Sequence, residues 1–385
     1  MNIYKGIAPQ SDYQKLLDML DFTFFNNDDE PVRDFLSLLP CLYKPEYDPC
    51  SKNYVVKEDD EMCAAVGFYT YNVQAADERL VFSGIGNVAV HPNHRSKGYM
   101  IDCMNGAIEE MSKLGADVSL LGGQKQRYGY FGFEPAGIGA HFDVTKTNLR
   151  HVFGKDAKSG LTVKEIKIDD SAELEFIASI YKSKPFYVDR PQSMLYDILC
   201  AGEGKSYMVL DGDTPVGYFA FNRYGAVSEF GCKCAKDAGR IAMAIIEFTD
   251  KNIKIHVPVF DRELINELLK VCEGDGIYHP EMFMILNFEN TVRAFLKVRA
   301  TYEKLCDGET TLLIHGTRGD EQINIKVVDN NVTVSKCSGE YDMELEALEA
   351  TRLLFSINSV KRDAFTPAVR SWLPLPIYCY SCDAV

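Results

Sequence analysis

The chain has 385 residues, of which 46% are apolar and 25% charged, and 41 Lys and Arg against 56 Asp and Glu give a net charge of −15. These proportions exclude a disordered or collagen-like chain and predict two or three globular domains. No cluster of Lys and Arg is present, which argues against a nucleic-acid-binding protein. An acidic field would attract cations such as polyamines, although many proteins are acidic for solubility alone.

The N-terminus has no apolar signal core, and no stretch of 18 apolar residues predicts a membrane span. We therefore expect a cytoplasmic protein with no membrane partner and with its 12 cysteines as reduced thiols. The pairs Cys232/Cys234 and Cys379/Cys382 have redox or metal spacing. Each pair lies without the further ligands that a zinc site requires, so we expect no metal.

The first 150 residues combine helical spacing with period-two strands. In chain order, the pattern predicts helices at 11–20 and 28–39, strands at 54–57, 64–71 and ending at 86–90, a helix after the turn 91–100, and a strand at 118–122.

The next segment repeats this plan, with strands at 206–210 and 216–221, a helix at about 237–249 and a strand at 254–258. Two such units suggest tandem copies of one fold. From about residue 290 a small α+β unit follows, with a helix around Val292–Leu296, strands at 310–315, 322–327 and 331–335, a helix marked by Leu345, Leu348 and Leu353, and an apolar extended tail at 372–377.

The stretch Val88–Met100 carries the most specific pattern of the chain. A strand ends, a His-Pro turn follows, and an amphipathic helix begins with Arg95-x-x-Gly98 at its mouth. The first turn of a helix leaves backbone N–H groups free and carries partial positive charge, so it can bind a pyrophosphate. Gly98 lets the backbone come close, and Arg95 and Lys97 add positive charge.

This stretch resembles the acetyl-coenzyme A site of the GNAT N-acetyltransferases, with the pattern Arg/Gln-x-x-Gly-x-Gly/Ala, although Met100 replaces the small third residue. With the run Tyr128–Phe133, the whole chain resembles the enhanced intracellular survival (Eis) acetyltransferases. The resemblance implies an α/β (α+β) fold with tandem GNAT units, the second degenerate, and a sterol-carrier-protein-like C-terminal domain. The implied domains are residues 1–150, 151–288 and 289–385, with the tail of the last reaching the active site.

The resemblance also implies acetyl-CoA as cosubstrate. The backbones of Val88 and Val90 would pair with the pantetheine arm like an added strand, and one amide would polarise the thioester carbonyl. The other expected cofactor contacts are Ala89, His94, Arg95, Ser96, Lys97, Gly98, Tyr99 and Met100.

Acetyl transfer needs a neutral amine, a group that accepts the ammonium proton and a group that protonates the thiolate. By resemblance, Tyr128 is the acid and the terminal carboxylate of Val385 is the base. The residues alone leave two alternatives open, an aromatic side chain packed at a strand end and a frayed terminus. The apolar segment Trp372–Ile377 argues against fraying.

For the acceptor we expect contacts from Phe24, Asp28 and Asp383, because carboxylates there could hold a polyamine or an aminoglycoside. The alternative for the acidic run 28–30 is the ordinary preference of helix N-termini for negative charge. Residues 231–239 of the second unit lack Arg-x-x-Gly, so we expect that unit to bind no coenzyme.

The resulting hypothesis is an acetyl-CoA-dependent N-acetyltransferase for primary amines of the aminoglycoside, polyamine or lysine type. By resemblance it is a homo-oligomer, expected to be hexameric. The alternatives are a non-catalytic module that binds CoA or an apolar ligand on the same scaffold, and an amino-acid N-acetyltransferase with a narrow pocket.

Overall fold

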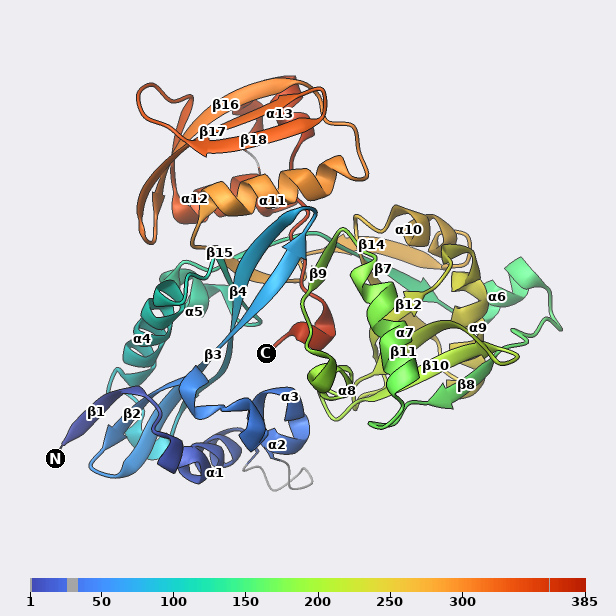
Figure 1. Ribbon diagram of the computed structural model, residues 1–385, viewed down its shortest axis with the longest axis horizontal. Helices are drawn as coiled ribbons and strands as arrows, with labels where there is room; N and C mark the ends of the chain where they lie inside the picture. The colour runs from blue at the N-terminus through green and yellow to red at the C-terminus, as the bar shows by residue number, and fades with distance from the viewer. Residues whose placement is uncertain (1, 26–33, 360) are drawn as a thin grey trace.

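The structure, a computed structural model, describes residues 2–25, 34–359 and 361–385. Figure 1 shows three units, with the C-terminus at the centre of the view, between the first and the second. Within the described ranges, no helix is long and apolar enough to cross a membrane. The α/β fold class is confirmed, since sheets and helices alternate in all three units.

The first unit is built on an eight-stranded sheet. In order across the sheet its strands are β1 (Ile3–Ile7), β2 (Asn53–Glu58), β3 (Glu61–Ala75), β4 (Glu78–Val90), β5 (Val118–Leu121), β15 (Glu281–Ile285) and β6 (Glu134–Ala136), while β9 (Phe186–Val188) pairs with β3. Its helices are α1 (Tyr13–Phe25), α2 (Phe35–Leu38), α3 (Pro40–Tyr43), α4 (Tyr99–Lys113) and α5 (Lys125–Tyr128). The strands predicted at 54–57, 64–71 and 86–90 and the helix after residue 98 are confirmed.

Side chains alternate across the strands of this sheet and define two faces. Phe68 and Ile85 pack in one core with the apolar residues of α4. Tyr69 packs in a separate core with the apolar residues of α1. The face opposite α4 is therefore the one that α1 and, further along, the C-terminal tail approach.

The second unit has two sheets. One contains β12 (Val227–Cys232), β11 (Thr214–Phe221), β10 (Lys205–Asp211) and β8 (Thr162–Glu165), and the other contains β13 (Ile253–Pro258), β7 (Gly139–Val144) and β14 (Gly274–Tyr278). Its helices are α6 (Lys146–Phe153), α7 (Ser171–Lys182), α8 (Leu195–Leu199), α9 (Ala238–Thr249) and α10 (Arg262–Leu268). The hairpin, helix and strand order predicted from the repeated pattern is present.

The third unit contains a four-stranded sheet, ordered β18 (Asn331–Lys336), β17 (Gly319–Val328), β16 (Gly308–Gly316) and β19 (Met343–Glu346), with α11 (Phe288–Ala300), α12 (Ala347–Phe355) and α13 (Pro367–Ser371). The prediction that Leu345 belongs to a helix is wrong. Leu345 belongs to β19, where it pairs with Ile314 of β16, and the helix begins two residues later.

Strand pairing links the first two units across the expected boundary at residue 150. Strand β7 pairs with β13 and β14 of the second unit. Strand β15 lies between β5 and β6 of the first sheet, and β9 pairs with β3. The first two units therefore exchange strands rather than meeting at a linker.

After α13 the chain runs as a buried, extended tail, as its composition predicts. Trp372 Nε1 donates to the carbonyl of Cys306 over 2.8 Å, and the amide of Leu375 donates to Leu354 over 2.7 Å. Figure 1 shows this red segment passing from the C-terminal unit to the centre of the molecule. All twelve cysteines are free thiols.

Candidate active site

The central strands of the first unit separate at their ends. Strand β4 pairs with β5 only from Phe82 to Gly84. From Ile85 to Val90 the edge of β4 that faces β5 has no strand partner among the described residues. On its other edge β4 stays paired with β3, and the register of that pairing shifts between Ala65 and Gly67. The unpaired edge at Val88 and Val90 is where the resemblance predicts the pantetheine arm.

The loop after β4 prepares the mouth of α4. Ser96 has φ 65° and Gly98 φ 82°, so the chain turns sharply before the helix begins at Tyr99. The backbone N–H groups of residues 97–100 have no protein acceptor within the described part of the chain. A Cβ added at Gly98 would meet nothing within 4 Å, so the space above these amides is open. The loop has the free donors that a pyrophosphate requires.

The charged side chains of this loop have different surroundings. Arg95 is exposed and has no ion-pair partner among the described residues. Lys97 Nζ lies 2.6 Å from Glu58 Oε1, and the Tyr99 hydroxyl donates to the same carboxylate. Lys97 and Tyr99 are therefore tethered to the end of β2, which leaves Arg95 as the cation that can reach a phosphate directly. Met100, in the first turn of α4, is partly buried and packs against the core that α4 shares with the sheet.

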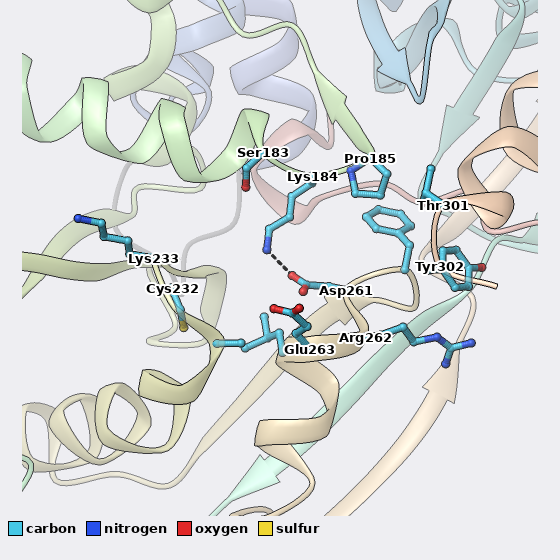
Figure 2. A pocket seen from close by; sticks show the side chains of 13 residues that line it. Ser183, Lys184, Pro185, Cys232, Lys233, Asp261, Arg262, Glu263, Thr301 and Tyr302 are labelled. Carbon is cyan, nitrogen blue, oxygen red and sulfur yellow. Dashed lines mark hydrogen bonds and ion pairs between the residues drawn. The ribbon is translucent and has the colours of Figure 1, made fainter. Parts of the chain in front are cut away.

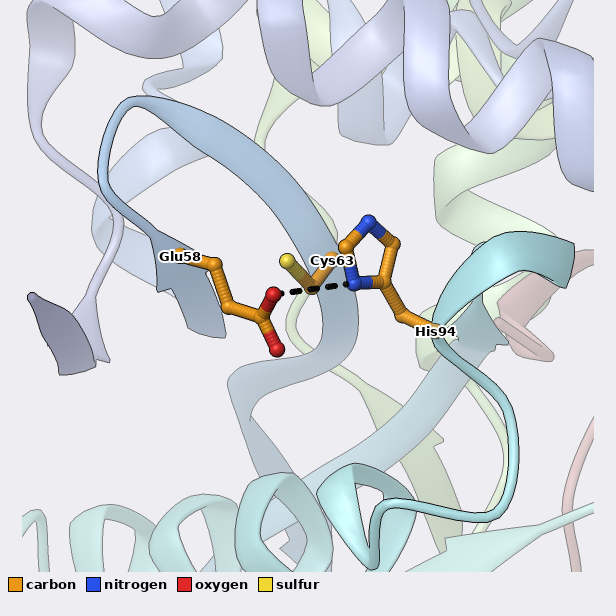
Figure 3. A group of neighbouring side chains, drawn as sticks. All are labelled: Glu58, Cys63 and His94. Atoms are coloured by element: carbon orange, nitrogen blue, oxygen red, sulfur yellow. Dashed lines mark ion pairs between the residues drawn. The ribbon is translucent and has the colours of Figure 1, made fainter. Parts of the chain in front are cut away.

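His94 is buried in the same network, with Nδ1 3.4 Å from Glu58 Oε2 and Nε2 3.1 Å from Glu61 Oε1. Figure 3 shows Glu58, Cys63 and His94 converging, and their ligand-type atoms lie within 4.8 Å of one another. The Lys97 ammonium, 3.2 Å from His94 Nδ1, already supplies positive charge to this group. Lys97 also lowers the pKa of Glu58 to about 2, with help from the Tyr99 hydroxyl. The group thus has a structural explanation, which is to hold the loop on the sheet.

Val385 lies on the face of the sheet opposite α4, above β4. A Cβ added at Gly84 would collide with the Val385 side chain, and one added at Gly86 would lie 3.2 Å from the Val385 carboxyl carbon. Because only glycine lacks a Cβ, Gly84 and Gly86 of β4 leave the space that Val385 occupies. The terminal carboxylate consequently lies beside the unpaired edge of β4.

Asp383, an expected acceptor contact, is held in a buried network of protein donors. Its two carboxylate oxygens accept from Arg190 over 2.8 Å each, and Oδ2 also accepts from the Tyr181 hydroxyl over 2.8 Å. Arg190 in turn donates to both oxygens of Glu229. Burial raises the pKa of Asp383, and the Arg190 charge opposes that rise. Asp383 thus anchors the tail through protein donors, and it also forms part of the wall of the cavity described next, so its contact with an acceptor stays a prediction.

A cavity of about 330 Å³ lies between β3, the segment 188–198 and the tail. Val385 forms part of its wall, together with Tyr69 and Tyr71. Phe24 does not line this cavity; it is exposed on α1 and packs edge-on against Phe35. Asp28 lies outside the described residues. The cavity is therefore open space that adjoins the terminal residue of the chain.

Tyr128 ends α5 and is buried. Its ring packs so closely over Gly123 that a Cβ there would collide with it. Its hydroxyl has no hydrogen-bond partner in the described ranges. Gly122 and Gly123 follow β5 directly, so Tyr128 stands at the end of β5, across the separated strands from β4.

Sequence reasoning missed Glu281, at the start of β15. The Glu281 side chain lies against Gly122, with Oε2 3.2 Å from the place where a Cβ would be. Its signal in the sequence was a carboxylate at the head of the apolar run Met282–Ile285. That signal does not reveal that the run pairs with β5.

Two other hollows do not carry this chemistry. One, of about 600 Å³, lies between the second unit and Thr301 and Tyr302, which follow α11. Its wall includes the ion pair of Lys184 and Asp261 drawn in Figure 2, with a separation of 2.5 Å. It contains no residue of β4 or of the loop before α4. A hollow in the C-terminal unit, lined by the buried Trp372 and Leu375, has a volume of only about 10 Å³.

Comparison with known proteins agrees with this geometry. Residues 7–136 match the model of the acetyltransferase (GNAT) domain family. A probable N-acyltransferase of unknown function from Enterococcus faecalis V583 is similar, with a TM-score of 0.68 and 15% identity over 100% of this chain and 97% of that one. A GCN5-related N-acetyltransferase from Anabaena variabilis ATCC 29413 has a TM-score of 0.65 and 15% identity, covering 91% and 89%.

Eis1 from Mycobacterium abscessus has a TM-score of 0.62 and 13% identity, covering 97% of this chain and 96% of that one. No curated protein matches the sequence. At these identities the solved structures show a shared fold along nearly the whole chain. The first third of the chain is a GNAT acetyltransferase domain, of a family that uses acetyl-CoA, and the protein is by that domain an N-acetyltransferase.

Proposed function

We propose that the protein transfers the acetyl group of acetyl-CoA directly to a primary amine of a small molecule of the polyamine, aminoglycoside or lysine type. The observation that carries this proposal is the position of Val385, whose carboxyl carbon lies over Gly86 beside the unpaired edge of β4. The same residue forms part of the wall of the 330 Å³ cavity. A carboxylate is thus available where acceptor and thioester would meet.

The cofactor would lie with its pyrophosphate on the amides of residues 97–100 and on Arg95, and with its pantetheine arm along Val88 and Val90. Such an arm continues the strand order as an extra strand would, because backbone donors and acceptors on that edge are unpaired. A β4 amide aimed at the thioester oxygen would stabilise the negative charge that develops on it during attack.

The terminal carboxylate would take a proton from the acceptor ammonium, and the neutral nitrogen would then attack the acetyl carbon. As the carbon–sulfur bond breaks, the Tyr128 hydroxyl would protonate the departing thiolate. The negative charge of the chain, −15 overall, favours a cationic acceptor. Asp189 and Asp383 in the cavity wall stand beside Lys52 and Arg190, so the terminal carboxylate is the local charge that favours a cation.

Two variants test these roles. Two glycines appended after Val385 should lower kcat by about 100-fold, in line with loss of a general base, with little change in KM for acetyl-CoA. Tyr128→Phe should likewise lower kcat more than coenzyme affinity. The measurement is thiol release across polyamines, aminoglycosides, amino acids and lysine peptides, with the same two glycines added at the N-terminus as control.

Full activity of both variants would contradict the assigned acid and base. Absence of turnover on every amine, with acetyl-CoA still bound, would favour a non-catalytic coenzyme-binding module. Membership in the Eis-like group, a sterol-carrier-like origin of the last unit, a hexameric assembly and a cytoplasmic location stay predictions of the resemblance.

A further inference from the structure

Glu281 lies on the same face of the first sheet as the terminal carboxylate. Its strand pairs Met282 with Leu121, which places Glu281 opposite Gly122, just past the end of β5. Alternation along β15 turns Glu281 to the same side as Phe283, and Phe283 packs in the core of the face opposite α4. Val385 occupies that face above β4. The two carboxylates thus flank the place where β4 and β5 separate.

Glu281 has no ion pair and no hydrogen bond within the described ranges. The contrast with Glu134, on the adjacent strand β6, is direct. Glu134 accepts from Arg352 Nε over 2.8 Å and from Lys125 Nζ over 2.9 Å. Both carboxylates are removed from bulk water, but only Glu134 is compensated by positive charge.

The surroundings explain how Glu281 titrates. Burial raises the pKa of Glu281 to about 7, and no neighbouring cation lowers it. The groups that feel its charge are Tyr71 on β3, Tyr278 at the end of β14 and Cys379 in the tail, all neutral at pH 7. Tyr71 also lines the acceptor cavity. Glu281 can therefore gain and lose a proton at physiological pH within electrostatic range of the acceptor site.

The chemistry of amide formation calls for such a group. An acceptor that binds as an ammonium ion must lose two protons from nitrogen, one before it attacks the acetyl carbon and one after the carbon–nitrogen bond has formed. The terminal carboxylate can take the first. A second acceptor is needed while that proton is still held, because the tetrahedral adduct would otherwise expel the amine rather than the thiolate.

We propose that Glu281 is a second proton-accepting carboxylate of the catalytic centre, which takes the proton that leaves nitrogen in the tetrahedral adduct. This inference rests on the proposed acetyl transfer.

The steps balance as follows. The nitrogen–hydrogen bond of the adduct breaks and an oxygen–hydrogen bond forms on Glu281, while the carbon–sulfur bond breaks and the sulfur takes the Tyr128 proton. Glu281 then passes its proton to solvent, and the Tyr128 oxygen takes one proton back from solvent. Val385 releases the first proton to solvent, which leaves the amide, the free thiol and one proton.

The test compares Glu281→Gln with the wild type and with Glu175→Gln, which changes an exposed glutamate of α7. Gln has the size of Glu but takes up no proton, so kcat should fall by about 100-fold, with KM for acetyl-CoA within about twofold. The wild-type kcat should lose activity below about pH 7 as Glu281 becomes protonated. That limb should be absent in Glu281→Gln, partly restored in Glu281→Asp and unchanged in Glu175→Gln.

A second measurement does not depend on turnover. Infrared difference titration of the resting enzyme should show a carboxyl C=O band with a midpoint near pH 7 that is missing in Glu281→Gln. Wild-type kcat and pH profile in Glu281→Gln, or no such band in the wild type, would overturn the inference while leaving acetyl transfer intact. Absence of turnover in the wild type would instead defeat the proposed function itself.

Discussion

In the first unit, β4 leaves β5 after Gly84 and its edge stays unpaired to Val90. In the second unit the corresponding strands, β12 and β13, also lie in different sheets. There the side chains of Tyr378 and Tyr380 stand against the residues of β12 and β13, and a cavity of only about 30 Å³ is left. The C-terminal tail thus fills the space between β12 and β13 and ends beside the space between β4 and β5.

The helices that follow these strands differ as well. At the mouth of α4, Gly98 and the open amides leave room for a phosphate. At the mouth of α9 the chain gives Lys233, Cys234 and Lys236, with no glycine three residues after an arginine. The same strand–helix plan can therefore serve as a binding site or as a support, depending on its loop and on what occupies the space between its strands.

The carboxylates of the two separations show the same contrast. Glu229, on β12, is buried and held by Arg190 through two hydrogen bonds. Glu281 lies by the open separation without any cationic partner in the described ranges. The charge of Glu229, compensated by Arg190, stabilises the filled space between β12 and β13. The charge of Glu281, with no such partner, lies at the open space between β4 and β5.

The largest effect is expected from Arg190, which joins β12 to the tail. Arg190→Met would leave Glu229 and Asp383 buried without a cation, which costs about 3–5 kcal/mol of folding free energy. It should also release the tail, so acetylation should fall together with stability. Urea unfolding and thiol release measure the two effects.

Arg190→Lys serves as the control, because it keeps the charge but loses the paired geometry. It should fold and retain part of the activity. Unchanged stability and turnover in Arg190→Met would show that the tail is positioned without the buried ion network. The filled separation would then play no part in placing Val385.

The parts of the first unit that depend on local pattern were predictable from sequence. The hairpin of β2 and β3, the long strand β4 and the loop before α4 follow from alternation, turn residues and the Arg95-x-x-Gly98 spacing. Each of these signals lies within a dozen residues. The expected coenzyme contacts accordingly lie together at one edge of the sheet.

The parts that depend on distant pairing were not predictable. Nothing in the pattern around Glu281 indicates that β15 enters the first sheet, and periodicity does not specify partners. Asp383 looks like a free acidic residue in sequence, since Arg190 lies 193 positions away. In the same way, Lys97 looked available for a phosphate until Glu58 was placed beside it.

Glu281 also predicts a difference in stability. Its pKa in the folded chain is about 7 against an ordinary value of 4.5, so the folded state binds more protons than the unfolded state between these pH values. Stability therefore falls as pH rises from about 4.5 to 7, and the full penalty is present above pH 7. Glu281→Gln should be more stable than the wild type at pH 8 by up to about 3 kcal/mol, and equally stable near pH 4.

Urea unfolding at the two pH values measures this difference, with Glu175→Gln again as the control. A gain that is the same at both pH values would mean that Gln stabilises by packing. A destabilised variant at pH 8 would show that the charge of Glu281 is compensated, and the contrast with Glu229 would disappear.

The smallest effect separates the open helix mouth of the first unit from an ordinary glycine turn. Gly98 and Gly115, at the two ends of α4, have φ values of 82° and 75°, and a Cβ at either would meet nothing within 4 Å. Alanine at either position should cost about 1–2 kcal/mol of stability, because L-residues are strained at positive φ. Only Gly98→Ala should also weaken acetyl-CoA binding, because its Cβ enters the space above the free amides. We expect about a tenfold loss of affinity, which corresponds to about 1.4 kcal/mol. Titration calorimetry should give one acetyl-CoA bound per wild-type chain. Two bound per chain, or equal affinities of Gly98→Ala and Gly115→Ala for acetyl-CoA, would mean that the loop before α4 does not distinguish the two units.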